Sequence, residues 1–367
     1  MSKEKAPILI AGAAVGILAV ILVLLGNPPN MGFCIACFER DIAGAIGLHR
    51  PWEAAWIRPE IPGILLGAFL TALFAREFRP RGGSSPMARF LVAMLVMIGA
   101  LAFLGCPLRM ILRLGGGDLN ALVALAGFVC GVFVGVVLLK AGFNFGRAQR
   151  QRDVNGWIMP GIMAGLLMMA VFPPVFKTGG PIFVGAKGHP GCGDDPLVSE
   201  GLGIAISLSA GLLVGILAQR SRLCLVGGIT DLMLVRSWHR VSGFIAILVL
   251  CFAGCLILHE AGVEAFAYWR IGFEGQPASH TAHLWNFLGM ALVGVGSALL
   301  GGCPFRQLVL AGNGNTDSGL TILGMLAGAA IVHNFGLAGA ATTHGKAAVV
   351  LGLVLVLLIG LLHREKG

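Results

Sequence analysis

Charged residues are scarce in this sequence: Asp, Glu, Lys and Arg together make up 12% of its 367 residues. That share is about half of what an average soluble domain carries. Hydrophobic residues make up 57% of the chain, and its mean hydropathy is +0.88. The composition therefore excludes an ordinary soluble domain and predicts a protein surrounded by membrane lipid.

Two kinds of functional signature are also missing. The chain has no glycine-rich nucleotide-binding loop, which argues against ATP-driven transport by this chain alone. His259, His280, His283, His333 and His344 are scattered without metal-ligand spacing, so we expect no metal site and no cofactor. The net charge of +9 comes from Lys and Arg in short loops, so nucleic acid is not an expected partner.

Apolar runs of about bilayer-spanning length recur along the chain. They are residues 7–26, 61–75, 88–105, 120–142, 157–176, 200–219, 241–262, 284–302, 318–337 and 347–363. Such a pattern is typical of an all-α polytopic membrane protein. We expect about ten transmembrane helices.

The basic residues indicate which loops face the cytoplasm, because cytoplasmic loops carry an excess of Lys and Arg. With the N-terminus inside, the basic clusters share one side: Arg76-Arg79-Arg81-Arg89, Lys140-Arg147-Arg150-Arg152, Arg220-Arg222-Arg236-Arg240 and His363-Arg364-Lys366. The acidic loops around Glu264 and Asp195 then lie outside. We therefore expect an inner-membrane protein with both termini in the cytoplasm.

Two cysteine-containing elements each occur twice. In the first element an aspartate follows the cysteine by seven residues, as Cys34 and Asp41 and again as Cys224 and Asp231. The second element is Gly-Cys-Pro-x-Arg, with Cys106 and Arg109 in one copy and Cys303 and Arg306 in the other. The two elements lie 72 residues apart in the first copy and 79 in the second. One ancestral unit is therefore present twice.

The two copies are five predicted spans apart, an odd number, which predicts two units of opposite orientation in the membrane. Inverted repeats of this kind are a transporter signature. We divide the chain into a first repeat at residues 1–150 and a connecting span with an outer loop at 151–199. A second repeat follows at 200–340, and a C-terminal span with a basic tail at 341–367.

The Gly-Cys-Pro-x-Arg element predicts a helix that starts at its cysteine. Proline is favoured at the first position of a helix, and it pushes the preceding residue out of helical geometry. Cys106 and Cys303 are therefore expected to be N-caps, where free N–H groups attract an anion. Arg109 and Arg306 add positive charge in the first turn. Because buried arginine is costly, each needs a partner, which we expect to be a passing anion or Asp41, Asp118, Asp231 or Asp317.

The segments 31–48 and 222–235 lie between spans but are themselves largely apolar. Short re-entrant helices fit both segments. Non-helical backbone at membrane depth is tolerated only where it faces protein or a cavity. Four such breaks predict a central path with the four repeated cysteines beside it: Cys34 and Cys106 approached from outside, Cys224 and Cys303 from inside.

The other cysteines are interpreted by position. Cys130, Cys251 and Cys255 lie inside uninterrupted spans and are expected to be packing residues. Cys37 forms a Cys-x-x-Cys motif with Cys34, a spacing used in redox chemistry. Cys192 lies in an outer loop of turn-forming residues, where it is either a first contact for an incoming anion or an exposed thiol.

Two functions from different classes fit these features. One is a transporter that moves a small anion past the cysteines. The other is a membrane thiol-disulfide oxidoreductase or sulfur-relay protein that uses the same residues. The sequence favours transport, because an electron relay needs cysteines in pairs and three of the four repeated elements carry only one. We therefore expect a transporter and not an enzyme.

The duplicated cysteine elements resemble those of the YeeE/YedE family of membrane proteins, over nearly the whole chain. The run Gly-Cys106-Pro-Leu-Arg-Met-Ile-Leu-Arg-Leu-Gly-Gly-Gly-Asp118 is similar to the selenium-associated YedE branch. The resemblance implies thiosulfate uptake for YeeE-like members and a role in selenium metabolism for the YedE branch. The expected cargo is thus thiosulfate, selenite, a selenide or a related anion.

The resemblance also implies roles for particular residues. Cys34, Cys106 and Cys303 match the substrate-path cysteines of the family, and Cys224 is the repeat mate of Cys34. A small TusA-like sulfur carrier is a frequent partner in the family, acting at the cytoplasmic mouth. The chain departs from the simpler family pattern in having Cys37 and Cys192.

Overall fold

The computed structural model describes residues 6–172, 200–339 and 342–364, and within them the chain is largely helical. The long helices are α1 (Ala6–Leu24), α3 (Glu60–Phe74), α4 (Pro86–Phe103), α6 (Asn120–Lys140), α7 (Asp153–Val171), α8 (Glu200–Ser221), α10 (His239–Glu260), α11 (His283–Leu300), α13 (Thr316–Asn334) and α14 (Thr343–Leu362). Each predicted apolar run coincides with one of these helices. Two 3₁₀ turns, η1 (Trp52–Ala54) and η2 (Glu264–Phe266), lie in loops.

The lengths of these helices confirm a polytopic membrane protein. In the described part of the chain, nine helical segments are long and apolar enough to cross a membrane. α3, with 15 residues, is a shorter apolar helix. Many large apolar side chains, such as Phe133, Val249 and Leu358, are exposed on the outer faces of the helices. A soluble protein would bury such side chains, whereas lipid covers them here.

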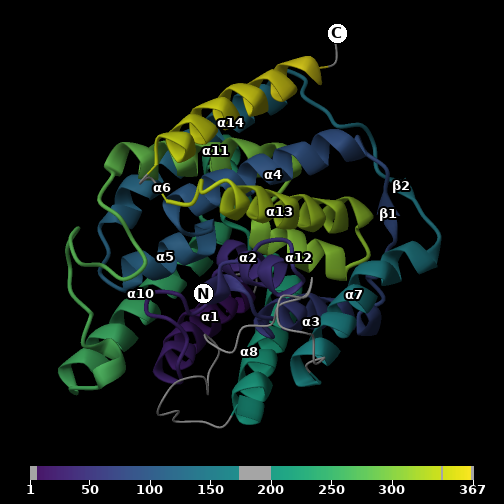
Figure 1. The fold of residues 1–367 in the computed structure, drawn as a ribbon. Helices are drawn as coiled ribbons and strands as arrows, with labels where there is room; N and C mark the ends of the chain where they lie inside the picture. The colour runs from purple at the N-terminus through teal and green to yellow at the C-terminus, as the bar shows by residue number, and fades with distance from the viewer. Residues whose placement is uncertain (1–5, 173–199, 340–341, 365–367) are drawn as a thin grey trace.

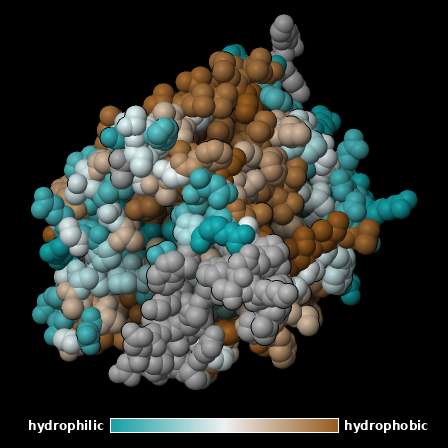
Figure 2. All heavy atoms as spheres, viewed as in Figure 1, coloured by the Kyte–Doolittle hydropathy of each residue, from teal (hydrophilic) through white to brown (hydrophobic). Residues whose placement is uncertain are grey.

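The surface of the molecule fits a lipid-embedded band. Figure 2 shows apolar side chains gathered over α14, with hydrophilic side chains toward both ends of the band. At one end lies a small antiparallel pair of strands, β1 (Arg81–Gly82) and β2 (Gln149–Arg150). Which end faces the cytoplasm stays a prediction from the basic loops.

Four short helices each begin directly after a repeated cysteine. They are α2 (Ile35–Ala45), α5 (Pro107–Gly115), α9 (Leu225–Val235) and α12 (Pro304–Gly312). At 1.5 Å per residue each is about 13 to 17 Å long, roughly half the thickness of a bilayer core. Figure 1 shows α2, α5 and α12 in the middle of the molecule, between α4, α11 and α13 on one side and α1, α3 and α10 on the other. The short helices thus form the interior.

Most helices of one unit pack on helices of the other unit, and equivalent helices do so in equivalent ways. α1 packs on α10 of the second unit, and its counterpart α8 packs on α3 of the first. In the same way α6 packs on α11 and α13 on α4, while α5 packs on α10 and α12 on α3. α7 and α14 do not follow this pattern, since α7 packs on α3 and α14 on α11. The division into repeats at residues 1–150 and 200–340, which leaves α7 and α14 outside, stays a prediction.

The turns around the short helices also repeat. Leu104 and Gly301, two residues before the capping cysteines, both adopt the left-handed conformation, with φ of 63° and 81°. Gly117 and Gly314, eleven residues after those cysteines, have φ of 85° and 87°. A left-handed φ is strained for a residue with a side chain, so Leu104 marks a turn that the fold imposes.

Glycine allows close helix contacts between the units, as between α6 and α11. A Cβ atom at Gly131 of α6 would overlap the carbonyl oxygen of Ala291 on α11, and a Cβ at Gly294 would lie 3.0 Å from the Cα of Gly131. Close backbone approach of this kind drives helix association in lipid, where water supplies no hydrophobic force.

Gly131→Ala is therefore expected to destabilise the protein by about 1 to 3 kcal/mol, the usual cost of an overpacked interior. Thermal unfolding in detergent would measure the loss as a lower midpoint. Gly165→Ala on α7 is the matched control, because no described atom lies within 4 Å of a Cβ placed there. Equal midpoints for the two variants would contradict the glycine contact between α6 and α11.

Candidate functional site

Cys34 and Cys106 form the first thiol pair of the interior. Cys34 is the N-cap of α2, and its Sγ accepts a hydrogen bond from the backbone N–H of Cys37 at 3.3 Å. The thiol of Cys34 also lies within hydrogen-bonding reach of the thiols of Cys106 and Cys37. These three side chains are buried. Two elements that are 72 residues apart are thus in direct contact.

Cys106 is the N-cap of α5, as its Cys-Pro pair predicts. Pro107 occupies the first turn, and Cys106 itself is extended, with φ of −84° and ψ of 171°. The Cys106 thiol lies beside the backbone N–H groups of Arg109 and of Ala36 in α2. The first turns of α5 and α2 therefore both border this sulfur atom, although within the described residues Cys106 accepts no side-chain capping hydrogen bond.

Cys224 and Cys303 form the equivalent pair in the second unit. Both are N-caps, of α9 and α12, and the Cys224 Sγ accepts from the N–H of Gly227 at 3.4 Å. Their thiols lie within hydrogen-bonding reach of each other. Cys106 also lies in the neighbourhood of Cys303. The four repeated cysteines are thus brought together as two neighbouring pairs.

The remaining cysteines fall into three groups. Cys130 is exposed on the outer face of α6. Cys251 and Cys255 are buried one turn apart on α10, and the Cys251 thiol donates to the carbonyl oxygen of Leu112 at 3.6 Å. Cys192 lies outside the described residues.

Arg109 is buried among backbone carbonyl groups. Its Nε donates to the oxygen of Asn30 at 3.0 Å and its Nη2 to that of Ala278 at 3.3 Å. Nη1 donates to the oxygen of Leu104 and lies 3.4 Å from the Sγ of Cys37. Carbonyl dipoles and one sulfur atom hold this guanidinium in place beside the first thiol pair.

The expectation that an aspartate pairs with Arg109 or Arg306 is wrong within the described part of the chain. The aspartates pair with other arginines: Asp41 with Arg40 and Arg58, Asp118 with Arg113, Asp231 with Arg240, and Asp317 with Arg89. The reason is partly geometric. Seven residues of helix separate Cys34 from Asp41 by about 10 Å, so the acid lies at a different depth from the cap.

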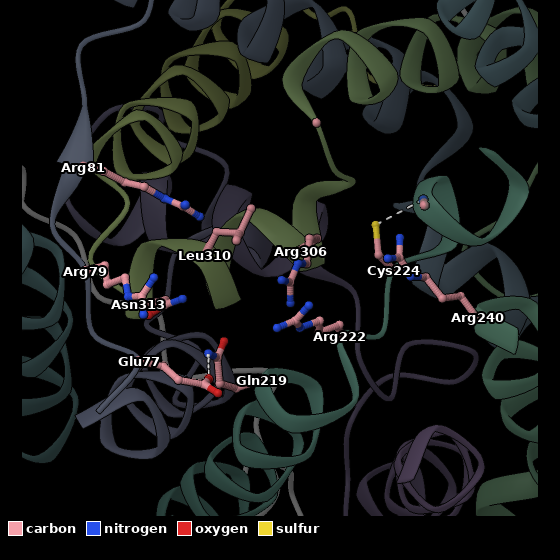
Figure 3. Close-up of a pocket in the computed structure, with 12 residues that line it drawn as sticks. Glu77, Arg79, Arg81, Gln219, Arg222, Cys224, Arg240, Arg306, Leu310 and Asn313 are labelled. Atoms are coloured by element: carbon pink, nitrogen blue, oxygen red, sulfur yellow. Dashed lines mark hydrogen bonds between the residues drawn. The ribbon is translucent and has the colours of Figure 1, made fainter. Parts of the chain in front are cut away.

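Arg306 projects into an open cavity of about 550 Å³ that reaches the second thiol pair. The cavity is lined by Glu77, Arg79, Arg81, Gln219, Arg222, Cys224, Gly227, Arg240, Gly301, Arg306, Leu310 and Asn313. Figure 3 shows the guanidinium groups of Arg222 and Arg306 pointing toward each other, with Cys224 to one side. Among the described residues, no hydrogen-bond partner is present for Nη1 of Arg306.

The cavity carries an excess of positive charge. Arg306 is exposed to the like charges of Arg222 and Arg240. Glu77, the acid of the lining, accepts from Gln219 at 3.2 Å. Converging guanidinium groups repel one another unless an anion lies between them, and a planar guanidinium can bind an oxyanion with two hydrogen bonds. The arrangement is therefore suited to hold a small oxyanion beside Cys224.

Sequence reasoning missed most of this cavity. Arg79, Arg81, Arg222 and Arg240 were interpreted only as markers of the cytoplasmic side. It also missed Arg113, which is fully buried with its Nε 2.7 Å from Asp118. No metal centre appears either: across the described ranges, no cluster of three or more His, Cys, Asp or Glu side chains could hold a metal ion.

The thiol contacts predict specific cross-links. A variant that retains only Cys34 and Cys106, with the other cysteines changed to alanine, is expected to form an internal disulfide on mild oxidation by copper phenanthroline. The same holds for a variant with only Cys224 and Cys303. Mass spectrometry after maleimide labelling would count the free thiols. A variant with only Cys34 and the surface residue Cys130 should keep both thiols, and cross-linking there at the same rate would contradict the pairing.

Comparison with known proteins agrees with this architecture. A family model described as Sulphur transport matches residues 1–108 and 220–362, more than half of the chain. The matched ranges include all four capping cysteines, whereas Arg109, α6 and α7 lie outside them. No curated protein matches the chain. The chain therefore belongs to the Sulphur transport family, the YeeE/YedE family of membrane proteins.

Proposed function

We propose that this multi-pass membrane protein imports a small sulfur- or selenium-containing anion along a path lined by Cys34, Cys106, Cys224 and Cys303. The observation that carries the proposal is the arginine-lined cavity that ends at Cys224, one of the two thiols of the second pair. Membership of the Sulphur transport family supports a sulfur anion as the cargo. The YedE-like sequence around Cys106 is the reason to include selenium compounds.

The proposed path joins the two thiol pairs to the cavity. An anion arriving from outside would first meet Cys34 and Cys106, beside Arg109. It would pass to Cys303, which lies in the neighbourhood of Cys106, and then to Cys224. The cavity with Arg306 would receive it on the cytoplasmic side, which the basic loops define.

The N-termini of the four short helices would lower the free-energy cost of moving an anion through the protein interior. An anion that leaves water loses its hydration, and an uncompensated charge is very costly in an apolar interior. Each capping site offers backbone N–H groups at the positive end of a helix dipole, which stabilise negative charge. The thiols at Cys106 and Cys303 add weak donors at the same points. Donors at successive sites allow the anion to move in short steps.

Partners and orientation form part of the same proposal. Both termini would be cytoplasmic, in the inner membrane. A TusA-like sulfur carrier would dock at the mouth of the cavity, where Arg79 and Arg81 lie. The central residues would be the four cysteines with Arg109 and Arg306. Asp41 and Asp231 would act indirectly, by pairing with Arg58 and Arg240.

A second candidate function is a thiol-disulfide or sulfur relay. Single cysteines in most repeated elements argue against it in the sequence, but the structure brings them together as Cys34 with Cys106 and Cys224 with Cys303. Neighbouring thiols are what a disulfide relay requires. Serine variants distinguish the two functions, because a hydroxyl group donates a hydrogen bond but cannot form a disulfide or persulfide.

Cys106→Ala and Cys303→Ala are each expected to reduce uptake of labelled thiosulfate into proteoliposomes by at least about 100-fold. The loss reports the thiol, since alanine keeps the Cβ atom and a volume change of one atom is tolerated in most cores. Cys130→Ala is the matched control and should retain wild-type uptake. Uptake that persists in the double variant of Cys106 and Cys303 would falsify the cysteine path.

Arg306→Lys is expected to raise the half-saturating concentration for thiosulfate by about tenfold, because a fork that binds two oxygens is replaced by a point charge. The effect should be larger than that of Arg150→Lys, a change on the surface strand β2. Concentration-dependent uptake in proteoliposomes would measure both. Identical half-saturation for wild type and Arg306→Lys would remove Arg306 from the path.

A further inference from the structure

Glu39 is a buried acid that the proposed path does not use. It lies on α2, two residues after Cys37, and 1% of it is exposed. Neither carboxyl oxygen has a hydrogen-bond partner among the described residues. Buried polar groups in folded proteins nearly always have a partner, so this carboxyl group needs an explanation.

None of the described charged groups around α2 pairs with Glu39. On α2 itself, Arg40 pairs with Asp41, which also binds Arg58. The titratable groups on the elements packed against α2 are Asp317 and His333 of α13, Arg89 of α4, Arg306 of α12, Glu60 of α3 and Glu53 of η1, together with Arg109 and His49 nearby. In the described part of the chain, burial disfavours a negative charge on Glu39, and no charged group nearby compensates for this cost.

These neighbours have other contacts. Asp317 binds Ser84 and Arg89, and Glu60 accepts from Asn27 at 3.0 Å. The rings of His49 and His333 stack on each other, with centroids 4.5 Å apart. Arg109 is held by carbonyl groups and Arg306 faces the cavity.

The second repeat shows that the fold does not need an acid at this position. Aligning Cys34 with Cys224 places Glu39 opposite Ile229, which is buried on α9. An apolar residue therefore suits the site. The acid is an addition to the first unit, placed one turn after Ala36, whose N–H group lies beside the Cys106 thiol.

A lone carboxylate in such surroundings is strongly unfavourable, whereas a carboxylic acid is tolerated. Glu39 thus holds a proton while it is buried and releases it only when water reaches it. Isolated acids at membrane depth are typical of proton pathways. α2 also carries Cys34, so a movement of this one short helix would expose the acid and the first thiol together.

We propose that Glu39 binds a proton that is transported together with the anion, an inference that rests on the proposed function. The carboxylate takes one proton from water on the outer side, and the carboxylic acid gives that proton to water on the cytoplasmic side. No electron is transferred. Because one proton moves with each thiosulfate dianion, the net charge carried inward changes from minus two to minus one. The proton gradient across the membrane then drives uptake of the anion.

Uptake of ³⁵S-thiosulfate into proteoliposomes tests the proposal. Wild-type uptake is expected to rise severalfold when the outside is made acidic relative to the inside. Glu39→Gln should show equal uptake with and without the pH gradient, yet still exchange labelled for unlabelled thiosulfate at equal pH. Glu53→Gln, a change at an exposed acid of η1, is the matched control and should respond like wild type.

A wild-type protein that ignores the gradient, or a Glu39→Gln variant that responds to it fully, would overturn the proton site while leaving transport intact. Absence of thiosulfate uptake in wild type would instead count against the proposed function. The site is then decided separately with dicyclohexylcarbodiimide, which modifies protonated carboxyl groups in apolar surroundings. Peptide mass spectrometry should find the adduct on Glu39, and an unmodified Glu39 would overturn the site.

Discussion

Every backbone N–H group at membrane depth must find a partner, and this constraint organises the interior of the protein. A helix that starts inside the bilayer presents four unpaired N–H groups. Here the starts of α2, α5, α9 and α12 meet in the interior with a cysteine at each cap. Cysteine is small enough to let two caps touch, as at Cys34 and Cys106, and polar enough to accept an N–H group. Unpaired N–H groups at these helix starts destabilise the fold when they have no partner, and the same groups can bind an anion.

A second constraint concerns buried charge, because only some of the buried arginines are paired with an acid. Arg113 pairs with Asp118, and Arg58 pairs with Asp41 while its guanidinium stacks over the Trp56 ring at 3.4 Å. Such pairs cost less than isolated charges, although they stabilise a fold only modestly. The aspartates neutralise Arg113 and Arg58. The positive charge of the interior is therefore concentrated at Arg109 and Arg306, which pair with no acid among the described residues. The distribution of aspartates thus determines where an anion is attracted.

The sequence predicted the parts of the fold that depend on local chemistry. Cys-Pro pairs fix where α5 and α12 begin, and apolar runs fix the spans, because both signals lie within a few residues. The carbonyl partners of Arg109 could not be predicted, since Asn30 and Ala278 belong to distant segments of the chain. The cavity shows the same limit: Arg79, Arg222 and Arg306 come from three regions of the chain. The sequence shows only that these residues are all positively charged, and a cytoplasmic location of their loops accounts for that charge equally well.

One difference between the units has a kinetic meaning. Cys37 holds the guanidinium of Arg109, whereas its counterpart Gly227 has no side chain to hold Arg306, and a Cβ there would meet Arg240. In the proposed path, Arg109 would therefore be held more firmly than Arg306. A firmly held arginine would select an anion by its shape, whereas a freer one could adjust to the molecule that receives the anion. In the proposed path, influx and efflux would meet these two unlike sites in opposite order, so transport from the two sides of the membrane would saturate at different concentrations.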